Sequence, residues 1–345
     1  MKRNMGSNKL KNTKLYSLLK KLEERPLRTA IEPTNICNAN CSFCAYRYST
    51  RKKAVMEFET YKEILEKIKE LDCRELLQFT PIVGDPFLDT EFIAKIRYAK
   101  SLNWFATIYT FTNLIGLKQS QVENLITSGL SALVISTCLQ GREDFKRIYG
   151  VDKFDKAMNN IFALLKSNKK HGFPISISVS LRHDKNFDLA NNQYYQKILK
   201  FTHKISVLND SYDNWCGLIK ADDLPKGQRF RKNKDKTIPC SQLYNGFVVT
   251  SNGDVGICRC RDINLDLKIG NIHQDNLSNI WQGGEIKKMR ENWLKGELPA
   301  ICRNCLQYTS VLEHPLIQKY ILRHIFNYPG FLITIIKSKL WRLIE

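Results

Sequence analysis

Three cysteines stand close together near the start of the chain, at C-x3-C-x2-C spacing: Cys37, Cys41 and Cys44. They follow an apolar-then-polar run at 28–34 that is typical of a strand leading into a loop. Iron–sulfur clusters are held by Cys thiolates, so this loop can hold three corners of a [4Fe–4S] cubane. With no fourth Cys nearby, one iron would keep an open position. A structural zinc loop is the alternative, but zinc ligands usually come as two pairs.

The loop resembles the cluster loop of radical S-adenosylmethionine (SAM) enzymes, in which an aromatic residue, here Phe43, precedes the last Cys. The resemblance implies that SAM binds the open iron. SAM is then cleaved to a 5′-deoxyadenosyl radical that abstracts a substrate hydrogen. The cofactor carries this chemistry, while the protein positions and shields it. A flavodoxin- or ferredoxin-type electron donor is also implied, and Phe43 is expected in the cofactor site.

Two later segments resemble parts of that family that hold SAM. Gly84 and Asp85 match the end of a Gly-Gly-Glu-Pro segment that binds the SAM amino group, although Val83 replaces the first Gly and the acid is one methylene shorter. Ser136 and Arg147 match a Ser and an Arg that hold the SAM carboxylate. Without the resemblance, these would be a plain turn and a solvated Arg.

Four further thiols come from separate places after residue 238: Cys240, Cys258, Cys302 and Cys305. An Asn-Gly hairpin signal at 252–253 precedes Cys258. Only a shared metal explains thiols at these places, and zinc is the simplest candidate for four cysteines. The order C-x12-G-x4-C, Gly-Asn-Ile, a Trp-containing helix and C-x2-C resembles the SPASM extension, or its one-cluster form, twitch. This resemblance implies one auxiliary [4Fe–4S] cluster. Cys260 is expected to point away from Cys258 and ranks below it as a ligand.

Two other thiols, Cys138 and Cys216, follow predicted strands and are expected at the barrel mouth. A thiol there could donate a hydrogen atom to a substrate radical and so be catalytic, or could ligate a metal. Free Cys also commonly fills space in a core, which is the expectation for Cys73.

Strands and helices alternate regularly and must position these groups. Six βα repeats predict a parallel sheet with right-handed crossovers, closing into a partial (β/α)6 TIM-like barrel of the α/β class. The chemistry of such barrels lies at the carboxyl ends of the strands, where the Cys triad falls. A small C-terminal α+β auxiliary-cluster domain should follow. Strands are expected at 28–32, 74–80, 104–111, 131–137, 174–182 and 204–209. Helices are expected at 59–71, 90–102, 118–128, 153–170 and 188–201.

The predicted organisation has five parts. They are a basic amphipathic extension (1–27), the radical SAM core (28–220), a linker (221–238), the auxiliary-cluster domain (239–310) and an amphipathic basic tail (311–345). The tail could lie on an anionic membrane surface, dock on a partner or pack on the barrel.

The formal net charge of +20 permits anionic partners without choosing one. Eleven cysteines without a signal peptide indicate a reducing, cytoplasmic setting, with the tail at the inner face of the membrane if it binds lipid. A non-catalytic zinc module that binds nucleic acid is the remote alternative. It would require basic residues clustered around aromatic ones, whereas the lysines here are scattered, so no nucleic acid is expected.

The sequence therefore predicts a radical SAM oxidoreductase. Its substrate is expected to be a small sugar or aminocyclitol, oxidised or rearranged with the help of the auxiliary cluster. A peptide- or protein-modifying maturase is the other enzyme hypothesis.

Overall fold

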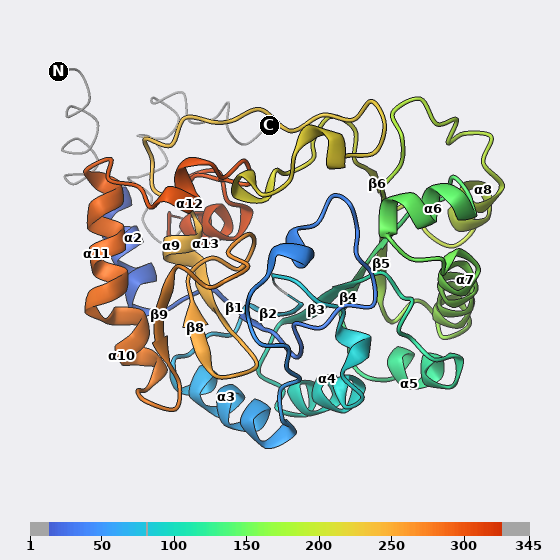
Figure 1. Ribbon diagram of the computed structural model, residues 1–345. Helices are drawn as coiled ribbons and strands as arrows, with labels where there is room; N and C mark the ends of the chain where they lie inside the picture. Colours follow the sequence, from blue (N-terminus) through green and yellow to red (C-terminus); the bar gives the residue numbers. More distant parts are fainter. Residues whose placement is uncertain (1–13, 81, 326–345) are drawn as a thin grey trace.

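The computed structural model describes residues 14–80 and 82–325 of the chain. Within these ranges all six predicted strands are present, each within three residues of its expected bounds (Figure 1). The strands are β1 (Arg28–Ile31), β2 (Leu76–Phe79), β3 (Thr107–Thr112), β4 (Ala132–Thr137), β5 (Ser176–Leu181) and β6 (Ile205–Val207). The predicted α/β barrel-like architecture is confirmed.

The crossover helices also match the prediction, with one addition. The expected ones are α3 (Phe58–Glu70), α4 (Phe92–Ser101), α5 (Val122–Ile126), α7 (Phe154–Lys170) and α8 (Gln193–Leu199). The segment between β4 and α7 contains a further helix, α6 (Arg142–Tyr149), which the sequence analysis did not predict. It begins after Gly141 and ends at Gly150, whose φ of 68° is the left-handed conformation typical of a helix C-terminus.

A single nine-stranded sheet connects the barrel with the C-terminal region. Its strand order is β6-β5-β4-β3-β2-β1-β7-β8-β9, and β1 to β6 are parallel neighbours in chain order. β7 (Gly246–Val249) pairs in parallel with β1, whereas β8 (Asp254–Gly256) and β9 (Lys268–Asn271) continue the sheet antiparallel. The predicted hairpin at 252–253 is therefore present, and it extends the barrel sheet beyond β1.

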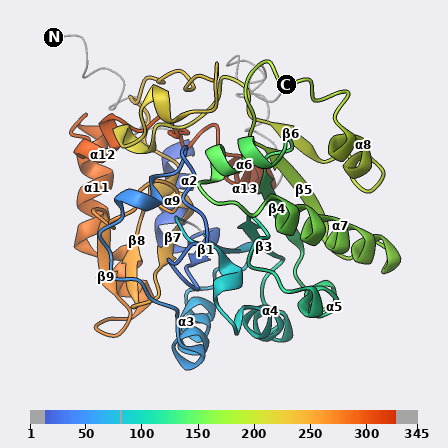
Figure 2. The same ribbon diagram turned by 45° about the vertical axis from the view of Figure 1, so that its right-hand side comes forward.

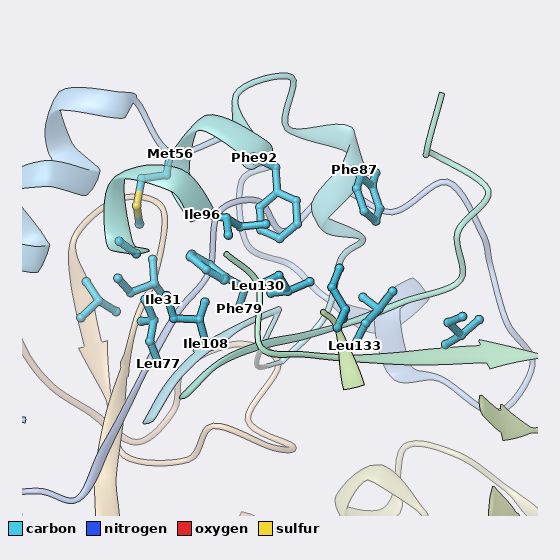
Figure 3. Packing of buried hydrophobic residues seen from close by; sticks show 14 of the residues in the cluster. Ile31, Met56, Leu77, Phe79, Phe87, Phe92, Ile96, Ile108, Leu130 and Leu133 are labelled. Atoms are coloured by element: carbon cyan, nitrogen blue, oxygen red, sulfur yellow. The ribbon is translucent and has the colours of Figure 1, made fainter. Parts of the chain in front are cut away.

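The two faces of the sheet carry different packing. Ile31 and Phe79 belong to the large hydrophobic core, whereas Ala30 and Val248 belong to a smaller cluster. Helices α3, α4, α5 and α7 flank the sheet on the side of the large core (Figures 1 and 2). Figure 3 shows apolar side chains from the strands meeting those of the helices, Phe79 near Phe92 among them. These two rings pack edge to face, with centroids 5.2 Å apart. Packing on these helices thus fixes the strands, whose carboxyl ends carry the loops with the predicted site residues.

The C-terminal region has four helices before the tail, and two of them pack on the N-terminal helix. The four are α9 (Gln242–Asn245), α10 (Leu277–Gln282), α11 (Gly284–Leu294) and α12 (Ala300–Arg303). The predicted N-terminal helix is α2 (Lys14–Glu24), and it contacts α9 and α10. Trp281 is fully buried there, and its indole Nε1 donates to the Leu22 carbonyl at 3.2 Å.

The first helix of the predicted tail is α13 (Pro315–Ile325). Ile317 is fully buried in the large core, and Arg323 pairs with Glu75 at 2.8 Å. This helix therefore packs back on the barrel. The second apolar run of the tail, at 331–344, lies outside the described residues. No helix in the described part of the chain is long and apolar enough to span a bilayer.

Candidate functional site

The Cys triad lies on the loop that follows β1, at the edge where all parallel strands end. Two backbone hydrogen bonds tie this loop to α6: Asn40 N donates to Tyr149 O at 3.0 Å, and Ser42 N donates to Ile148 O at 2.9 Å. The Cys44 amide closes a tight turn onto the Cys41 carbonyl at 3.1 Å. Backbone hydrogen bonds to α6 and within the loop therefore hold the conformation of the Cys loop.

The three thiols of the triad are close enough to affect each other's ionisation. Burial, together with the charges of Asp85 and Cys44, raises the pKa of Cys37 to about 12. Burial also raises the pKa of Cys41 and of Cys44. The thiols are thus neutral until a metal displaces their protons, which is the behaviour expected of a buried thiolate site.

The turn after β2 packs directly against the triad loop. A Cβ on Gly84 would lie 2.5 Å from the Thr34 carbonyl oxygen, and the φ of Gly84 is +109°. The Asp85 amide donates to the Ile36 carbonyl at 2.9 Å. Only glycine fits this close approach, so Gly84 brings the turn beside the Cys loop.

The Asp85 carboxylate lies in the protein interior, where 1% of the residue is exposed. It accepts hydrogen bonds from Thr112 Oγ1 at 2.8 Å, from the Asn113 amide at 2.9 Å and from the Phe87 amide at 3.2 Å. Burial raises the pKa of Asp85, and these donors oppose the shift. The carboxylate thus joins the ends of β2 and β3. An ionised carboxylate has about four acceptor sites, so capacity for about one more donor remains.

Ser136 and Arg147, the expected ligands of the SAM carboxylate, lie in different surroundings. Ser136 Oγ is 3.0 Å from the hydroxyl of Tyr149, whose pKa is raised by burial and then by the neighbouring Cys41. Arg147 pairs with Asp144 at 2.6 Å and with Asp184 at 2.7 Å. The Arg147 guanidinium is therefore already neutralised on the surface of α6.

The guanidinium beside the triad belongs to Arg182, directly after β5, which the sequence analysis missed. It lies 5.1 Å from the centroid of the Phe43 ring, and its buried Nε has no partner among the described residues. Its charge lowers the pKa of Cys41 and Cys44 against the larger effect of burial. A basic residue at the carboxyl end of a predicted strand was the available signal.

Six cysteines line a second cavity on the C-terminal side. They are Cys216, Cys240, Cys258, Cys260, Cys302 and Cys305. Apolar side chains complete much of the wall, namely Leu243, Ile257, Leu267, Trp293 and Ile301. The four cysteines predicted to ligate an auxiliary cluster are thus brought together, although they come from three separate segments.

The prediction that Cys260 points away from Cys258 is wrong. Residues two apart on a strand share a face, and β8 has already ended at Gly256. Both thiols line the same cavity, and Gln242 Nε2 donates to the Cys260 sulfur at 3.5 Å.

Cys216 and Cys138 lie in different places despite their similar positions after strands. Cys216 lines the auxiliary cavity together with Cys305. Cys138 is fully buried in the large core, as is Cys73. The two thiols therefore differ in their surroundings, and a catalytic role for either stays a prediction.

Both thiol sets fit iron–sulfur clusters by the chemistry of their donors. Soft thiolate ligands select iron–sulfur clusters, zinc and Cu(I) over harder cations. In residues 14–80 and 82–325, no three His, Cys, Asp or Glu side chains lie close enough together to hold a single metal ion. The six C-terminal thiols instead surround a cavity, and burial raises the pKa of Cys240 to about 12.

A charged and aromatic group connects the two thiol sets. Trp215 Nε1 donates to the Phe43 carbonyl at 2.9 Å, on the triad loop. Arg261 Nε pairs with Asp213 at 2.7 Å, and its guanidinium lies 4.3 Å from the Trp215 ring centroid. The charge of Arg261 acts on Cys44 and on Cys305. The turn that carries Trp215 therefore contacts both the triad loop and the segment that carries the auxiliary thiols.

Two family models match the chain. One, described as the radical SAM superfamily, matches residues 31–182. The other, described as an iron-sulfur cluster-binding domain and named SPASM, matches residues 240–306. The two matches contain the triad and the four predicted auxiliary ligands, respectively.

Three relatives illustrate the range of similar proteins, and the two with a named activity belong to different activity classes. An uncharacterised protein of Methanocaldococcus jannaschii is 30% identical over 38% of this chain, and the match spans 41% of that protein's length. The PqqA peptide cyclase of Gluconobacter oxydans is 22% identical, over 82% of this chain and 84% of its own length. The S-adenosyl-L-methionine-dependent 2-deoxy-scyllo-inosamine dehydrogenase of Niallia circulans is 21% identical, over 80% of this chain and 90% of its own length.

Solved structures show the same fold at low sequence identity. Native anSMEcpe with bound AdoMet gives a TM-score of 0.54 at 16% identity, covering 88% of this chain and 99% of that chain. BtrN in complex with AdoMet and 2-DOIA gives 0.53 at 18% identity, covering 81% and 92%.

Proposed function

This chain belongs to the radical SAM superfamily and carries a SPASM iron–sulfur domain, and from that premise we propose that it oxidises a small, hydroxyl-rich substrate of the sugar or aminocyclitol kind. The observation that carries the proposal is the single auxiliary cavity. Of eleven cysteines, three form the triad, six line the cavity, and Cys73 and Cys138 lie in the core. Beyond the four proposed ligands only Cys216 and Cys260 remain in the cavity, too few thiols for a second four-cysteine cluster. This favours the one-cluster form of the extension, to which the aminocyclitol dehydrogenases belong.

The residues of the chain would hold the cofactors as follows. Cys37, Cys41 and Cys44 would bind the SAM-site cluster, and the auxiliary cluster would be bound by Cys240, Cys258, Cys302 and Cys305. When bound, the first cluster with SAM would supply a hydrogen-abstracting radical, and the auxiliary cluster would supply a one-electron acceptor beside the barrel.

Four side chains or turns would position SAM. The turn at Gly84 and Asp85 would receive its amino group, since the carboxylate has capacity for about one more hydrogen bond. Arg182 would pair with its carboxylate, because this guanidinium lies beside the triad and its Nε lacks a partner in the described structure. Phe43 and Ser136 would lie along the same cofactor.

The substrate experiment uses deuterium transfer. Anaerobically reconstituted protein should contain about eight irons, two cubanes' worth, with little zinc. Incubated with SAM, reductant and ring-deuterated 2-deoxy-scyllo-inosamine or related cyclitols, it should place deuterium in 5′-deoxyadenosine and form a carbonyl product. Protein that carries stoichiometric zinc and no iron–sulfur absorption would refute the whole assignment.

Peptide modification is the second candidate, because the PqqA peptide cyclase aligns over a comparable share of the chain. Deuterium transfer from a labelled peptide, with none from any cyclitol or sugar, would establish this alternative. Radical SAM membership itself would stand in either case.

A further inference from the structure

The face of the barrel sheet that is turned away from helices α3, α4, α5 and α7 carries polar side chains. Successive residues of a strand point to opposite faces. Because Leu77 and Ile108 belong to the large core under those helices, their neighbours Gln78 and Tyr109 lie on the opposite, inner face. Phe111, two residues after Tyr109, is 39% exposed. The inner face is therefore open to solvent near the carboxyl ends of the strands.

Two guanidinium groups lie at the other end of this face, where the strands begin. Arg28 is the first residue of β1, and its Nη2 donates to Gln78 Oε1 at 3.1 Å. The Tyr109 hydroxyl donates to the same oxygen at 2.7 Å. Arg259 is fully buried, and its Nη2 donates to Asn245 Oδ1. One guanidinium thus comes from the barrel and the other from the C-terminal region.

The pairing of β7 with β1 brings these two arginines together. Arg28 is the register partner of Gly246, the residue that follows Asn245. A Cβ on Gly246 would lie 1.7 Å from the Arg28 carbonyl oxygen and 2.8 Å from Arg259 Nη1. Only glycine leaves room for both groups. The Arg259 guanidinium therefore lies directly beside the start of β1.

The positive charges of this pair are not neutralised within residues 14–80 and 82–325. Neither Arg28 nor Arg259 forms an ion pair there, and Arg28 Nε, Arg259 Nε and Arg259 Nη1 are buried without a hydrogen-bond partner. Burial and the charge of Arg28 lower the pKa of Arg259 to about 9, so the group is still a cation at neutral pH. An unpaired buried charge is costly. A ligand that supplies the missing negative charge would remove this cost.

Other arginines near the cofactor sites already have carboxylate partners. Arg51 pairs with Glu32 at 2.7 Å, and Arg261 pairs with Asp213 at 2.7 Å. The thiolates of an auxiliary cluster are an alternative source of negative charge, because Arg259 follows Cys258 in the sequence. In the described structure, however, neither Arg28 nor Arg259 lines the auxiliary cavity. The unpaired charges therefore belong to the barrel interior.

We propose that Arg28 and Arg259 form an anion-binding subsite at the base of the barrel interior, and that the substrate carries a carboxylate or phosphate group bound there. The inference rests on the proposed function, and it narrows the hydroxyl-rich class to sugar acids and sugar phosphates. Guanidinium groups suit both anions because their N–H donors pair with two oxygens at once. β1 extends for about 10 Å beyond Arg28. An acid group bound at the base therefore leaves the far end of a sugar-sized molecule near the triad loop.

Isothermal titration calorimetry tests the subsite on full-length protein with both clusters, without SAM or reductant. Gluconate and glucose 6-phosphate are the acidic probes, and glucose and glucosamine are the neutral and cationic controls. At least one acid should bind about ten- to a hundred-fold more tightly than either control, because it gains a charge-assisted hydrogen bond. The tighter of the two acids distinguishes a carboxylate subsite from a phosphate subsite.

Variants assign the binding to the two arginines. Arg28→Met and Arg259→Met should each lower the affinity for the acid about tenfold or more. Arg28→Lys should give an intermediate affinity, because it keeps the charge but loses the paired donors. Arg290→Met is the matched control, since Arg290 is also buried but lies 4.8 Å from the Trp281 ring centroid. It should bind the acid as the wild type does, and all four variants should keep about eight irons.

Three results would overturn the proposal. The first is that neither acid binds more tightly than glucose, and the second is that Arg28→Met and Arg259→Met bind the acid as the wild type does. The third is a loss of about four irons from Arg259→Met, which would assign its charge to the auxiliary cluster. Binding is measured without turnover. Absence of deuterium transfer from every sugar would therefore count against the proposed function and leave the binding result separate.

Discussion

Replacing Lys95 by Met should destabilise the protein strongly, because it removes one partner of a buried ion pair. Lys95 Nζ lies 2.6 Å from Asp89 Oδ2, and the two side chains are 0% and 1% exposed. The same ammonium donates to the Met56 carbonyl. Asp89 also accepts a hydrogen bond from the amide of Glu91, the residue before α4, at 2.9 Å. The variant therefore leaves a carboxylate buried without its cation at the turn that follows Asp85.

The expected loss in the free energy of unfolding is about 3–5 kcal/mol, the usual cost of breaking a buried ion pair by removing one partner. Met keeps most of the aliphatic volume of Lys95, so little of this cost comes from a cavity. Replacing both partners, as Asp89→Asn with Lys95→Met, removes the unpaired charge. The double variant should thus recover about half or more of the lost stability.

Urea unfolding under anaerobic conditions, followed by circular dichroism, measures these differences. Arg97→Met is the matched control on the same helix, since Arg97 is exposed and bonds only to Asn124. Its effect should stay within about 0.5 kcal/mol. A Lys95→Met variant as stable as Arg97→Met would refute the reasoning, as would a double variant less stable than Lys95→Met.

The Lys95→Met deficit should also depend on pH. Burial raises the pKa of Asp89, and the hydrogen bond from Lys95 opposes this shift. Without Lys95 the folded-state pKa rises further above the unfolded value of about 3.9. A raised carboxyl pKa contributes stability that is complete below the unfolded value and is lost as pH rises through the folded value. The deficit should therefore be larger at pH 8 than at pH 5.

Three further predictions concern the cofactor sites. Arg182→Gln should weaken SAM binding about ten- to a hundred-fold, measured by isothermal titration of iron-loaded protein, because it removes a charge-assisted hydrogen bond. Arg147→Gln should change the SAM affinity by less than about three-fold. A larger loss in Arg147→Gln than in Arg182→Gln would instead make Arg147 the ligand of the SAM carboxylate. Gly84→Ala should disrupt the turn, since its Cβ would lie 2.5 Å from a backbone oxygen, so iron content and SAM binding should both fall. Cys302→Ala should lose about four irons yet still form 5′-deoxyadenosine without substrate turnover. Cys260→Ala should keep all of its iron. If Cys260→Ala loses iron while Cys302→Ala keeps it, Cys260 is the ligand of the auxiliary cluster and Cys302 is not.

The local features of this protein were determined by its sequence. The triad spacing places three thiols on one loop whatever surrounds it, and Asn252-Gly253 specifies a hairpin through backbone preferences alone. Strand and helix alternation predicted the barrel because parallel strands require crossover connections. These features depend on neighbours within a few residues, so the sequence expresses them directly.

The partners of side chains far apart in the chain were decided by the tertiary structure. Arg147 lies on α6 and pairs with Asp184 beyond the end of β5, whereas Arg182 lies beside the triad. The parallel pairing of β7 with β1 joins segments separated by more than two hundred residues. Cys216 reaches the cavity that Cys305 also lines through a turn whose backbone is held by long-range contacts to Phe43 and Arg261. Such contacts depend on the balance of packing, strain and chain entropy over the whole domain, which no local pattern in the sequence specifies.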